Sequence, residues 1–240
     1  MRQFKAGYEI LTYISKGAVE ELKKIEEIAR VCYKSEDKIT KDSYKDLIKK
    51  LIDRGHEAML EHSTLSVKFV CDRGVSHELV RHRIASFAQE STRYCNYGNE
   101  KHGGEINVVD LEQGMRILNY EDKKIFDLLD VWVDAMIYAE KCYLKMIELG
   151  ASPQIARSVL PNSTKTEIVI TANYREWRNI FKLRTAESAH PQMREIMIPL
   201  LSEVYTKIPI IFEDIYEDKV IPELMDELDN AKNPSVEETL

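Results

Sequence analysis

The chain has 240 residues and a formal net charge of -7, with a hydrophobic fraction of 44% and a charged fraction of 31%. These fractions are typical of a globular protein, and the length suits one large domain or two small ones. The acidic balance argues against bulk binding of nucleic acid, which needs a basic surface. No apolar run approaches the roughly 20 residues that span a bilayer, and no signal peptide follows Met1. We therefore predict a cytoplasmic protein without membrane or nucleic-acid partners.

Hydrophobic periodicity predicts the elements of the first part of the chain. Two amphipathic helices and one strand are expected: 18–32, 42–54 and 64–71. Gly55 is a helix stop. A turn at 72–74 precedes a short helix from about Ser76, which carries Arg81 and His82 near its C-terminal end.

The later elements are separated by a loop at 95–104, which is rich in Asn and Gly. The expected strands and helices are 106–109, 121–149, 153–160, 167–171, 173–184 and 191–207. Asn173 is the expected N-cap of its helix, and Pro199 is expected to kink or interrupt the last one. No repeat or linker divides the chain. We predict one α+β domain over 1–225, followed by a polar acidic tail over 226–240.

The most informative segment is Arg81-His82-Arg83-Ile84-Ala85-Ser86-Phe87-Ala88-Gln89-Glu90-Ser91-Thr92-Arg93-Tyr94. It crowds three arginines and a histidine into an acidic protein. An anion held between these side chains explains the crowding, because the planar guanidinium fork matches phosphate or carboxylate. The alternative is a solvated cationic loop, or arginines that pair with Glu78 and Glu90.

Other kinds of site have weaker support. His56-Glu57 does not continue into the H-E-x-x-H pattern, because Leu60 stands at the last position, so we predict no metal site. No Gly-rich phosphate loop is present in the sequence. Ser91 and Cys95 are possible nucleophiles, but no neighbouring base activates either of them. The four cysteines form no C-x-x-C pair, which predicts buried, reduced thiols: Cys32, Cys71, Cys95 and Cys142.

Arg81-His82-Arg83, seven residues and then Ser91 resembles the R-H-R-x7-S signature of the flavin-dependent thymidylate synthases. Four further elements are similar in the same order: Gly55 to His62, Ala156 to Pro161, Asn173 to Arg184, and His190 to Met193. In the third, Ile180 and Phe181 are shifted relative to the family pattern. The resemblance covers roughly residues 50–200.

Membership of that family implies an α+β fold with a central, mostly antiparallel sheet flanked by helices. It implies conversion of dUMP to dTMP, with methylenetetrahydrofolate as carbon donor and FAD, reduced by NADPH, as hydride carrier. The family's active sites lie between the subunits of a homotetramer.

The resemblance also implies roles for individual residues. The expected FAD contacts, some across a subunit boundary, are His56, Arg81, His82, Arg83, Gln89, Asn173, Arg175 and Asn179. The expected dUMP contacts are Glu78, Arg81, Gln89, Glu90, Ser91, Arg93, Arg157 and Arg184. Arg184 is the expected catalytic group, because it favours the ionised N3 of uracil. Ser91 is expected to bind the substrate rather than to attack it.

Two positions depart from the family pattern. Many members have a hydroxyl residue at the position of Ala58, where it contacts the flavin, and Glu at the position of Gln89. A role that needs a carboxylate at Gln89 would fail or pass to Glu90. A second hypothesis from another class is a nucleotide- or RNA-binding module without catalysis, whose binding would weaken steeply with salt.

Overall fold

The structure is a computed structural model that describes residues 1–99 and 103–222. Contacts within the chain gather into two compact units. The first unit comprises Met1–Thr12, Leu65–Ala172 and His190–Ile196. The second comprises Tyr13–Thr64, Asn173–Ala189 and, within the described residues, 197–222.

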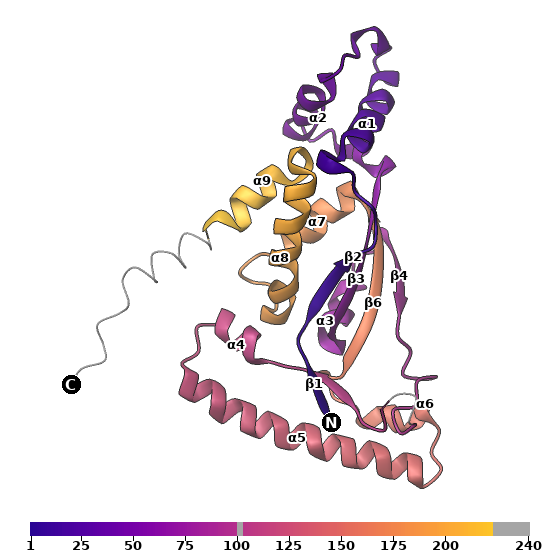
Figure 1. The fold of residues 1–240 in the computed structure, drawn as a ribbon, viewed down its shortest axis with the longest axis vertical. Helices are drawn as coiled ribbons and strands as arrows, with labels where there is room; N and C mark the ends of the chain where they lie inside the picture. Colours follow the sequence, from indigo (N-terminus) through magenta and orange to yellow (C-terminus); the bar gives the residue numbers. More distant parts are fainter. Residues whose placement is uncertain (100–102, 223–240) are drawn as a thin grey trace, which may run out of the picture. The chain divides into compact units, whose positions relative to one another are not determined.

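The first unit contains the strands, which form two sheets (Figure 1). Their bounds are β1 Arg2–Phe4, β2 Gly7–Ile10, β3 Thr64–Asp72, β4 Ala85–Gln89, β5 Asn107–Val109 and β6 Lys165–Asn173. The larger sheet has the strand order β2-β3-β6-β4, and the β2–β3 and β4–β6 pairs are antiparallel. Strands β1 and β5 pair in parallel. In β3 and β6 buried residues alternate with half-buried ones, so each strand presents one apolar face to the core.

Helices cover the sheets of the first unit: α3 Arg73–Leu79, α4 Glu112–Ile117, α5 Asp122–Glu148, α6 Pro153–Ala156 and the 3-10 helix η5 Arg157–Val159. Helix α5 passes below the N-terminal end of β1 in the view of Figure 1. Its Met136 and Tyr143 form one buried cluster with Ile106 and Val108. This packing removes one face of α5 from water and leaves the other charged.

The second unit is built from helices: α1 Val19–Val31, α2 Ser43–Asp53, α7 Tyr174–Arg184, α9 Pro209–Lys219 and the 3-10 helices η1 Lys16–Ala18, η2 Glu36–Lys38 and η3 Glu57–His62. Helix α8, Pro191–Lys207, begins in the first unit and ends in the second. Three aromatic rings pack together in the core of the second unit. Phe181 lies tilted against Trp177 with ring centroids 5.5 Å apart, and it meets Phe212 edge to face at 5.6 Å.

Most predicted elements are confirmed, and so is the α+β class with an antiparallel sheet flanked by helices. Gly55 and Gly150 end α2 and α5 with φ values of +69° and +90°, which an L side chain rarely adopts. The described part of 95–104 lies outside helices and strands, and 100–102 lie outside the described residues. The extent of the predicted domain, 1–225, stays a prediction, because the predicted tail also lies outside the described residues.

Three predictions are wrong. Helix α3 starts at Arg73 rather than near Ser76, because the Asp72 side chain caps it by accepting the N–H of Val75 at 2.6 Å. The helix ends at Leu79, so Arg81 and His82 follow it. Helix α8 runs across Pro199 without interruption, so the expected interruption is wrong, whereas the expected kink stays a prediction.

The cysteines agree with the expectation only in part. All four are free, but only Cys71 is buried, and Cys32 is exposed. Burial raises the pKa of the Cys71 thiol to about 12, which makes it a packing residue rather than a nucleophile. Over the described residues, no helix is both long and apolar enough to cross a bilayer.

A buried arginine organises the second unit. Arg178 on α7 is about 1% exposed; it donates to both carboxylate oxygens of Asp214 at 2.7 Å and to Glu57 at 3.1 Å. It also donates to the carbonyl of Ile211. One guanidinium thereby joins α7, α9 and η3.

A carboxyl group in the first unit, unlike Arg178, is partly buried without an ion-pair partner among the described residues to compensate it. Glu195 on α8 has a buried Oε2 atom that accepts no hydrogen bond from the described residues. The pKa of Glu195 is raised to about 7, first by burial and then by the charges of Asp110 and Asp72, while Lys5 acts against them.

We expect Arg178→Met to lower the free energy of unfolding by about 3 kcal/mol, because it leaves two carboxylates without their partner. The control is Lys49→Met, which removes an exposed pair with Glu213 at 3.2 Å and should cost much less stability, because exposed ion pairs contribute little. Urea unfolding at matched protein concentration measures both. Equal losses would show that Arg178 does not organise the unit.

We expect Glu195→Gln to stabilise the protein by about 1–2 kcal/mol at pH 8, after allowing for partial solvent access. The folded pKa lies above the ordinary value of 4.5, so stability is lost as pH rises from about 4.5 through 7. The gain should therefore shrink towards pH 4.5. Thermal unfolding across this range, with the exposed Glu187→Gln as control, measures it, and a pH-independent gain would contradict the assignment.

Candidate functional site

The arginine-rich segment begins in the connection between α3 and β4. Arg81 and Arg83 are exposed there, whereas His82 is 5% exposed. The backbone N–H of Arg81 donates to Glu78 at 3.2 Å and that of His82 to Leu79 at 3.2 Å, so the chain makes a tight turn after the helix. The two arginines therefore face outward from a fixed backbone.

The end of β4 is tied to α3 through Gln89. Its Nε2 donates to Ser76 Oγ at 2.8 Å and to Thr166 Oγ1 of β6 at 3.3 Å. Ser76 in turn donates to the carbonyl of Arg73 at 3.0 Å. Gln89 uses both of its N–H donors inside the first unit, which leaves its carbonyl oxygen as the group that can contact a ligand.

Glu90 is held by main-chain and side-chain bonds. Its carbonyl accepts from Arg73 Nη1 at 3.3 Å, and its Oε1 accepts from the Tyr97 hydroxyl at 3.1 Å. Burial, and then the charge of Glu90, raise the pKa of Tyr97. The phenol therefore keeps its proton at neutral pH and serves as a steady donor to the carboxylate.

Ser91 opens a turn that meets the second arginine element. The N–H of Cys95 donates to the Ser91 carbonyl at 2.9 Å, and the N–H of Arg93 donates to Ser91 Oγ at 3.3 Å. Arg157 Nη1 donates to Thr92 Oγ1 at 3.3 Å. The segments predicted to bind dUMP around Ser91 and Arg157 are therefore in contact within the first unit.

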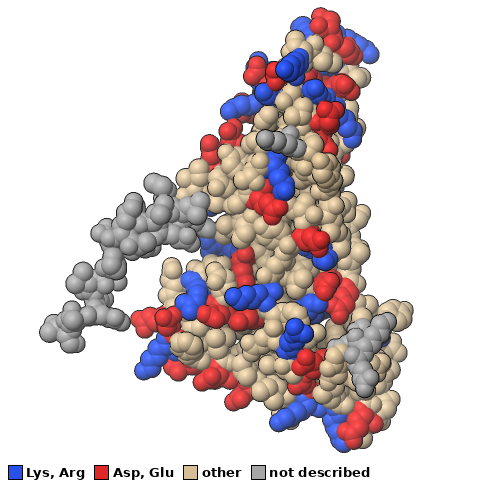
Figure 2. Space-filling model, viewed as in Figure 1, with Lys and Arg blue, Asp and Glu red and all other residues tan. Residues whose placement is uncertain are grey.

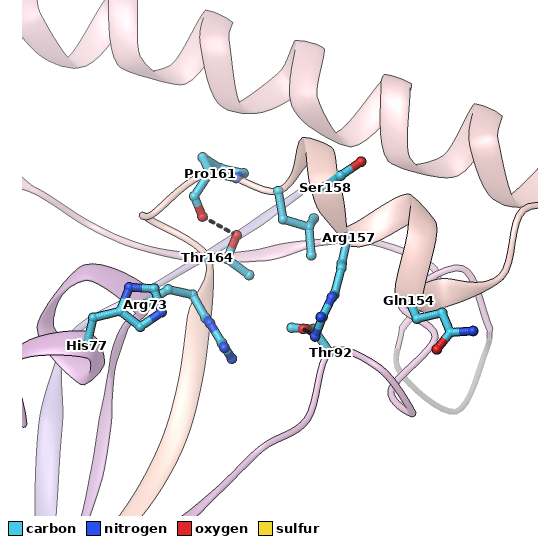
Figure 3. Close-up of a pocket in the computed structure, with 9 residues that line it drawn as sticks. Arg73, His77, Thr92, Gln154, Arg157, Ser158, Pro161 and Thr164 are labelled. Atoms are coloured by element: carbon cyan, nitrogen blue, oxygen red, sulfur yellow. Dashed lines mark hydrogen bonds between the residues drawn. The ribbon is translucent and has the colours of Figure 1, made fainter. Parts of the chain in front are cut away.

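A cavity of about 500 Å³ opens beside this contact (Figure 3). Its walls are Arg73, His77, Thr92, Gln154, Arg157, Ser158, Leu160, Pro161 and Thr164. Arg73 and Arg157 extend towards the same space from α3 and η5 (Figure 3). Of these residues, sequence reasoning had selected only Arg157. Arg73 and His77 were missed because Asp72 was not recognised as a helix cap. With Asp72 as the N-cap, Arg73 and His77 both belong to α3 and lie one helical turn apart.

The second unit holds the other predicted residues. His56 is exposed and lines an apolar cavity of about 320 Å³ with Ala29, Cys32, Tyr33, Leu51, Ala58 and Met59. Asn173 caps α7 by accepting the N–H of Glu176 at 2.8 Å, as predicted. Arg184 is half-buried at the last position of α7.

Two more residues of α7 are predicted to contact FAD. Asn179 donates to Glu176 at 3.2 Å, and Arg175 pairs with Glu61 at 2.6 Å. Each keeps unused hydrogen-bonding groups, namely the carbonyl oxygen of Asn179 and four N–H groups of Arg175. The remaining predicted FAD residues belong to the first unit, so a shared contact with one flavin stays a prediction.

Charge is mixed on the face shown in Figure 2, where blue and red side chains are interspersed. The cationic cavity is thus a local feature of an acidic protein. Over residues 1–99 and 103–222, no cluster of three His, Cys, Asp or Glu side chains could hold a metal ion.

Fold and cavity together define an α+β protein with a cavity that is lined by two arginines and a histidine. The family model described as "Thymidylate synthase complementing protein" matches residues 16–210. A flavin-dependent thymidylate synthase from Corynebacterium aurimucosum is 32% identical over 234 residues, covering 92% of this chain and 89% of that one. The chain belongs to the flavin-dependent thymidylate synthase family, as the motifs predicted.

Other relatives match a shorter stretch. The flavin-dependent thymidylate synthase of Pyrococcus horikoshii is 36% identical over 169 residues, which is 70% of this chain. The match spans 65% of the length of that relative and of the one from Pyrococcus abyssi. The crystal structure of a UMP/dUMP methylase, PolB from Streptomyces cacaoi, bound with 5-Br dUMP, has a TM-score of 0.73 at 22% identity. The alignment covers 91% of this chain and 97% of that one. The two chains share a fold.

We expect Gln89→Glu to lower the free energy of unfolding by about 1 kcal/mol, the worth of one hydrogen bond. A carboxylate at this position would require Ser76 to donate to it, which breaks the Ser76 bond to Arg73. Thermal unfolding measures the loss, and the matched variant Gln154→Glu, at an exposed position, should cost less. An unchanged stability would show that the Ser76 connection is dispensable.

Proposed function

We propose that this protein converts dUMP to dTMP by reductive methylation. Methylenetetrahydrofolate is the proposed carbon donor, and FAD, reduced by NADPH, is the proposed hydride carrier. One observation carries the proposal: Arg157 binds Thr92 beside Ser91, which joins two family elements at the edge of a cationic cavity. The names of the relatives and of the structural neighbour support dUMP as substrate and a flavin as cofactor.

The residues of the second unit suit a flavin. The cavity beside His56 is apolar and about 320 Å³ in volume, which fits part of a planar aromatic group. Ala58 lines this cavity, so it offers a methyl group and its backbone where many relatives have a hydroxyl. When bound, FAD would supply the hydride for the reaction.

The chain's own groups bind and polarise dUMP in this proposal. Arg93 and Arg157 grip the phosphate, and Arg184 stabilises the negative charge that ionisation of N3 places on the uracil ring. C5 thereby becomes nucleophilic towards the methylene carbon of the folate. Bound and reduced FAD would supply the hydride that turns this carbon into a methyl group, while the C5 proton is lost and tetrahydrofolate is the leaving group.

No protein nucleophile is needed in this scheme. The Ser91 hydroxyl accepts the N–H of Arg93, and no histidine or carboxylate of the described residues bonds to it. Glu90 is engaged by Tyr97. Ser91 is therefore proposed as a substrate ligand.

We also propose a homotetramer with active sites between subunits and, because all four cysteines are free, a cytoplasmic location.

The test begins with the absorption spectrum of the purified protein, before and after dUMP and NADPH are added. A flavin spectrum that bleaches with NADPH, together with dTMP formation once methylenetetrahydrofolate is present, is the expected result. A colourless protein that binds RNA with steep salt dependence would instead favour the non-catalytic binding module.

We expect Arg184→Ala to retain flavin and to lose dTMP formation by about 100- to 1,000-fold, the usual effect of removing one charge-stabilising donor. The control is Lys182→Ala, which removes an exposed cation from the same helix and should remain active. Flavin content by absorbance and dTMP by chromatography are the measurements. Full turnover by the Arg184 variant would remove its assigned role.

A further inference from the structure

Two arginines in the first-unit cavity have no acidic partner among the residues that the structure describes. Neither Arg73 nor Arg157 forms an ion pair with a carboxylate of the described residues, and no Asp or Glu lines the cavity. His77 adds a third basic side chain to the same wall. Cations brought together without a counter-charge repel one another, so the arrangement is stabilised when an anion enters.

Each arginine uses one nitrogen to position itself and keeps the others available. Arg73 Nη1 bonds to the Glu90 carbonyl, and Arg157 Nη1 bonds to Thr92 Oγ1. A guanidinium has five N–H groups, so both retain donors that can face the cavity. Two guanidinium groups that line the same cavity suit the oxygens of a phosphate group, because a phosphate accepts several charge-assisted hydrogen bonds at once.

The wall that carries Arg73 is rigidly held. The N–H of Arg73 donates to the carbonyls of Asn162 and Thr164, at 2.9 and 3.1 Å. Asp72 caps the same helix. The Arg73 side chain therefore starts from a backbone fixed on both sides, and binding an anion there orders little that is not already ordered.

We propose that Arg73, supported by His77, binds a phosphate monoester together with Arg157. The cavity volume of about 500 Å³ exceeds that of a phosphate alone and suits a nucleotide that carries one. The identification of that nucleotide as dUMP rests on the proposed function. Arg73 and His77 then belong to the binding site, although they lie outside the segment from Arg81 to Arg93.

The alternative role for Arg73 is to hold the Glu90 carbonyl in place. The two roles differ in what they do to a ligand without phosphate. A positioning role affects dUMP and deoxyuridine alike, because both contact the segment from Gln89 to Arg93. A phosphate-binding role affects dUMP alone.

The experiment measures binding of dUMP and deoxyuridine to flavin-loaded protein by calorimetry. In Arg73→Met we expect dUMP affinity to fall about 10- to 100-fold, as for the loss of a charge-assisted hydrogen bond, while deoxyuridine affinity is unchanged. His77→Leu, which leaves the Glu90 bond intact, should show a smaller loss in the same direction. The control is Arg116→Met, which should change neither affinity. Arg116 lies on α4 and pairs with Glu112 of the same helix and with Asp122 at the start of α5.

A second arm separates two sources of the phosphate monoester. If the cavity takes the 2′-phosphate of NADPH instead, Arg73→Met should raise the KM for NADPH and leave that for NADH and the dUMP affinity unchanged. Either phosphate-specific loss supports the inference. Equal losses for dUMP and deoxyuridine, or no loss for any phosphate ligand, would overturn it.

Titration with inorganic phosphate keeps this inference distinct from the proposed function. Wild-type protein that binds phosphate, with weaker binding in Arg73→Met and unchanged binding in Arg116→Met, supports the anion site even if no dTMP is formed. Phosphate binding that is identical in all three proteins overturns the site even if the enzyme is active.

Discussion

The candidate site depends on the hydrogen bonds of one amide. Gln89 ends β4, an edge strand of the larger sheet, and an edge strand has only one neighbour to hold it in register. By donating to Ser76 and Thr166, Gln89 connects that strand to α3 and to β6 at once. The residues that follow, Glu90 and Ser91, therefore leave the sheet in a defined direction rather than as a loose loop.

A second set of bonds converts this direction into a site. Arg73 reaches back from α3 to the Glu90 carbonyl, and Arg157 reaches across from η5 to Thr92. Both arginines therefore help to hold the turn and also line the cavity. The placement of positive charge and the shape of the site cannot be varied independently, which explains why cations lie close together here despite their repulsion.

Regular periodicity explains what could be predicted from the sequence. The helices α1, α2, α5 and α7 each bury one face, so their apolar spacing predicted them closely. Strand β4, Ala-Ser-Phe-Ala-Gln, was missed because it contains no β-branched residue and lies at an edge. Pro199 was expected to disturb α8, but the loss of one backbone donor does not stop a helix whose residues on both sides are buried.

The site was predictable only where its residues form a motif. Ser91, Arg157 and the arginine-rich segment lie in recognisable spacing, whereas Arg73 and His77 depend on where α3 begins. That start is set by the side chain of Asp72. Asp72 opens the tripeptide Asp-Arg-Gly, which has the composition of a turn. The same tripeptide opens a helix here because the carboxylate satisfies the N–H of Val75, which a turn would leave to water.

Local charge, rather than net charge, decides which ligands the chain can attract. A formal net charge of -7 repels polyanions at a distance, but that field is screened within about 10 Å at 0.1 M salt. Inside the cavity, Arg73 and Arg157 face a ligand with no carboxylate among the lining residues to offset them. A small phosphate monoester can pass the acidic surface and still meet concentrated positive charge, whereas a nucleic acid would have to lie across that surface. The charge pattern thus favours a nucleotide over a polymer.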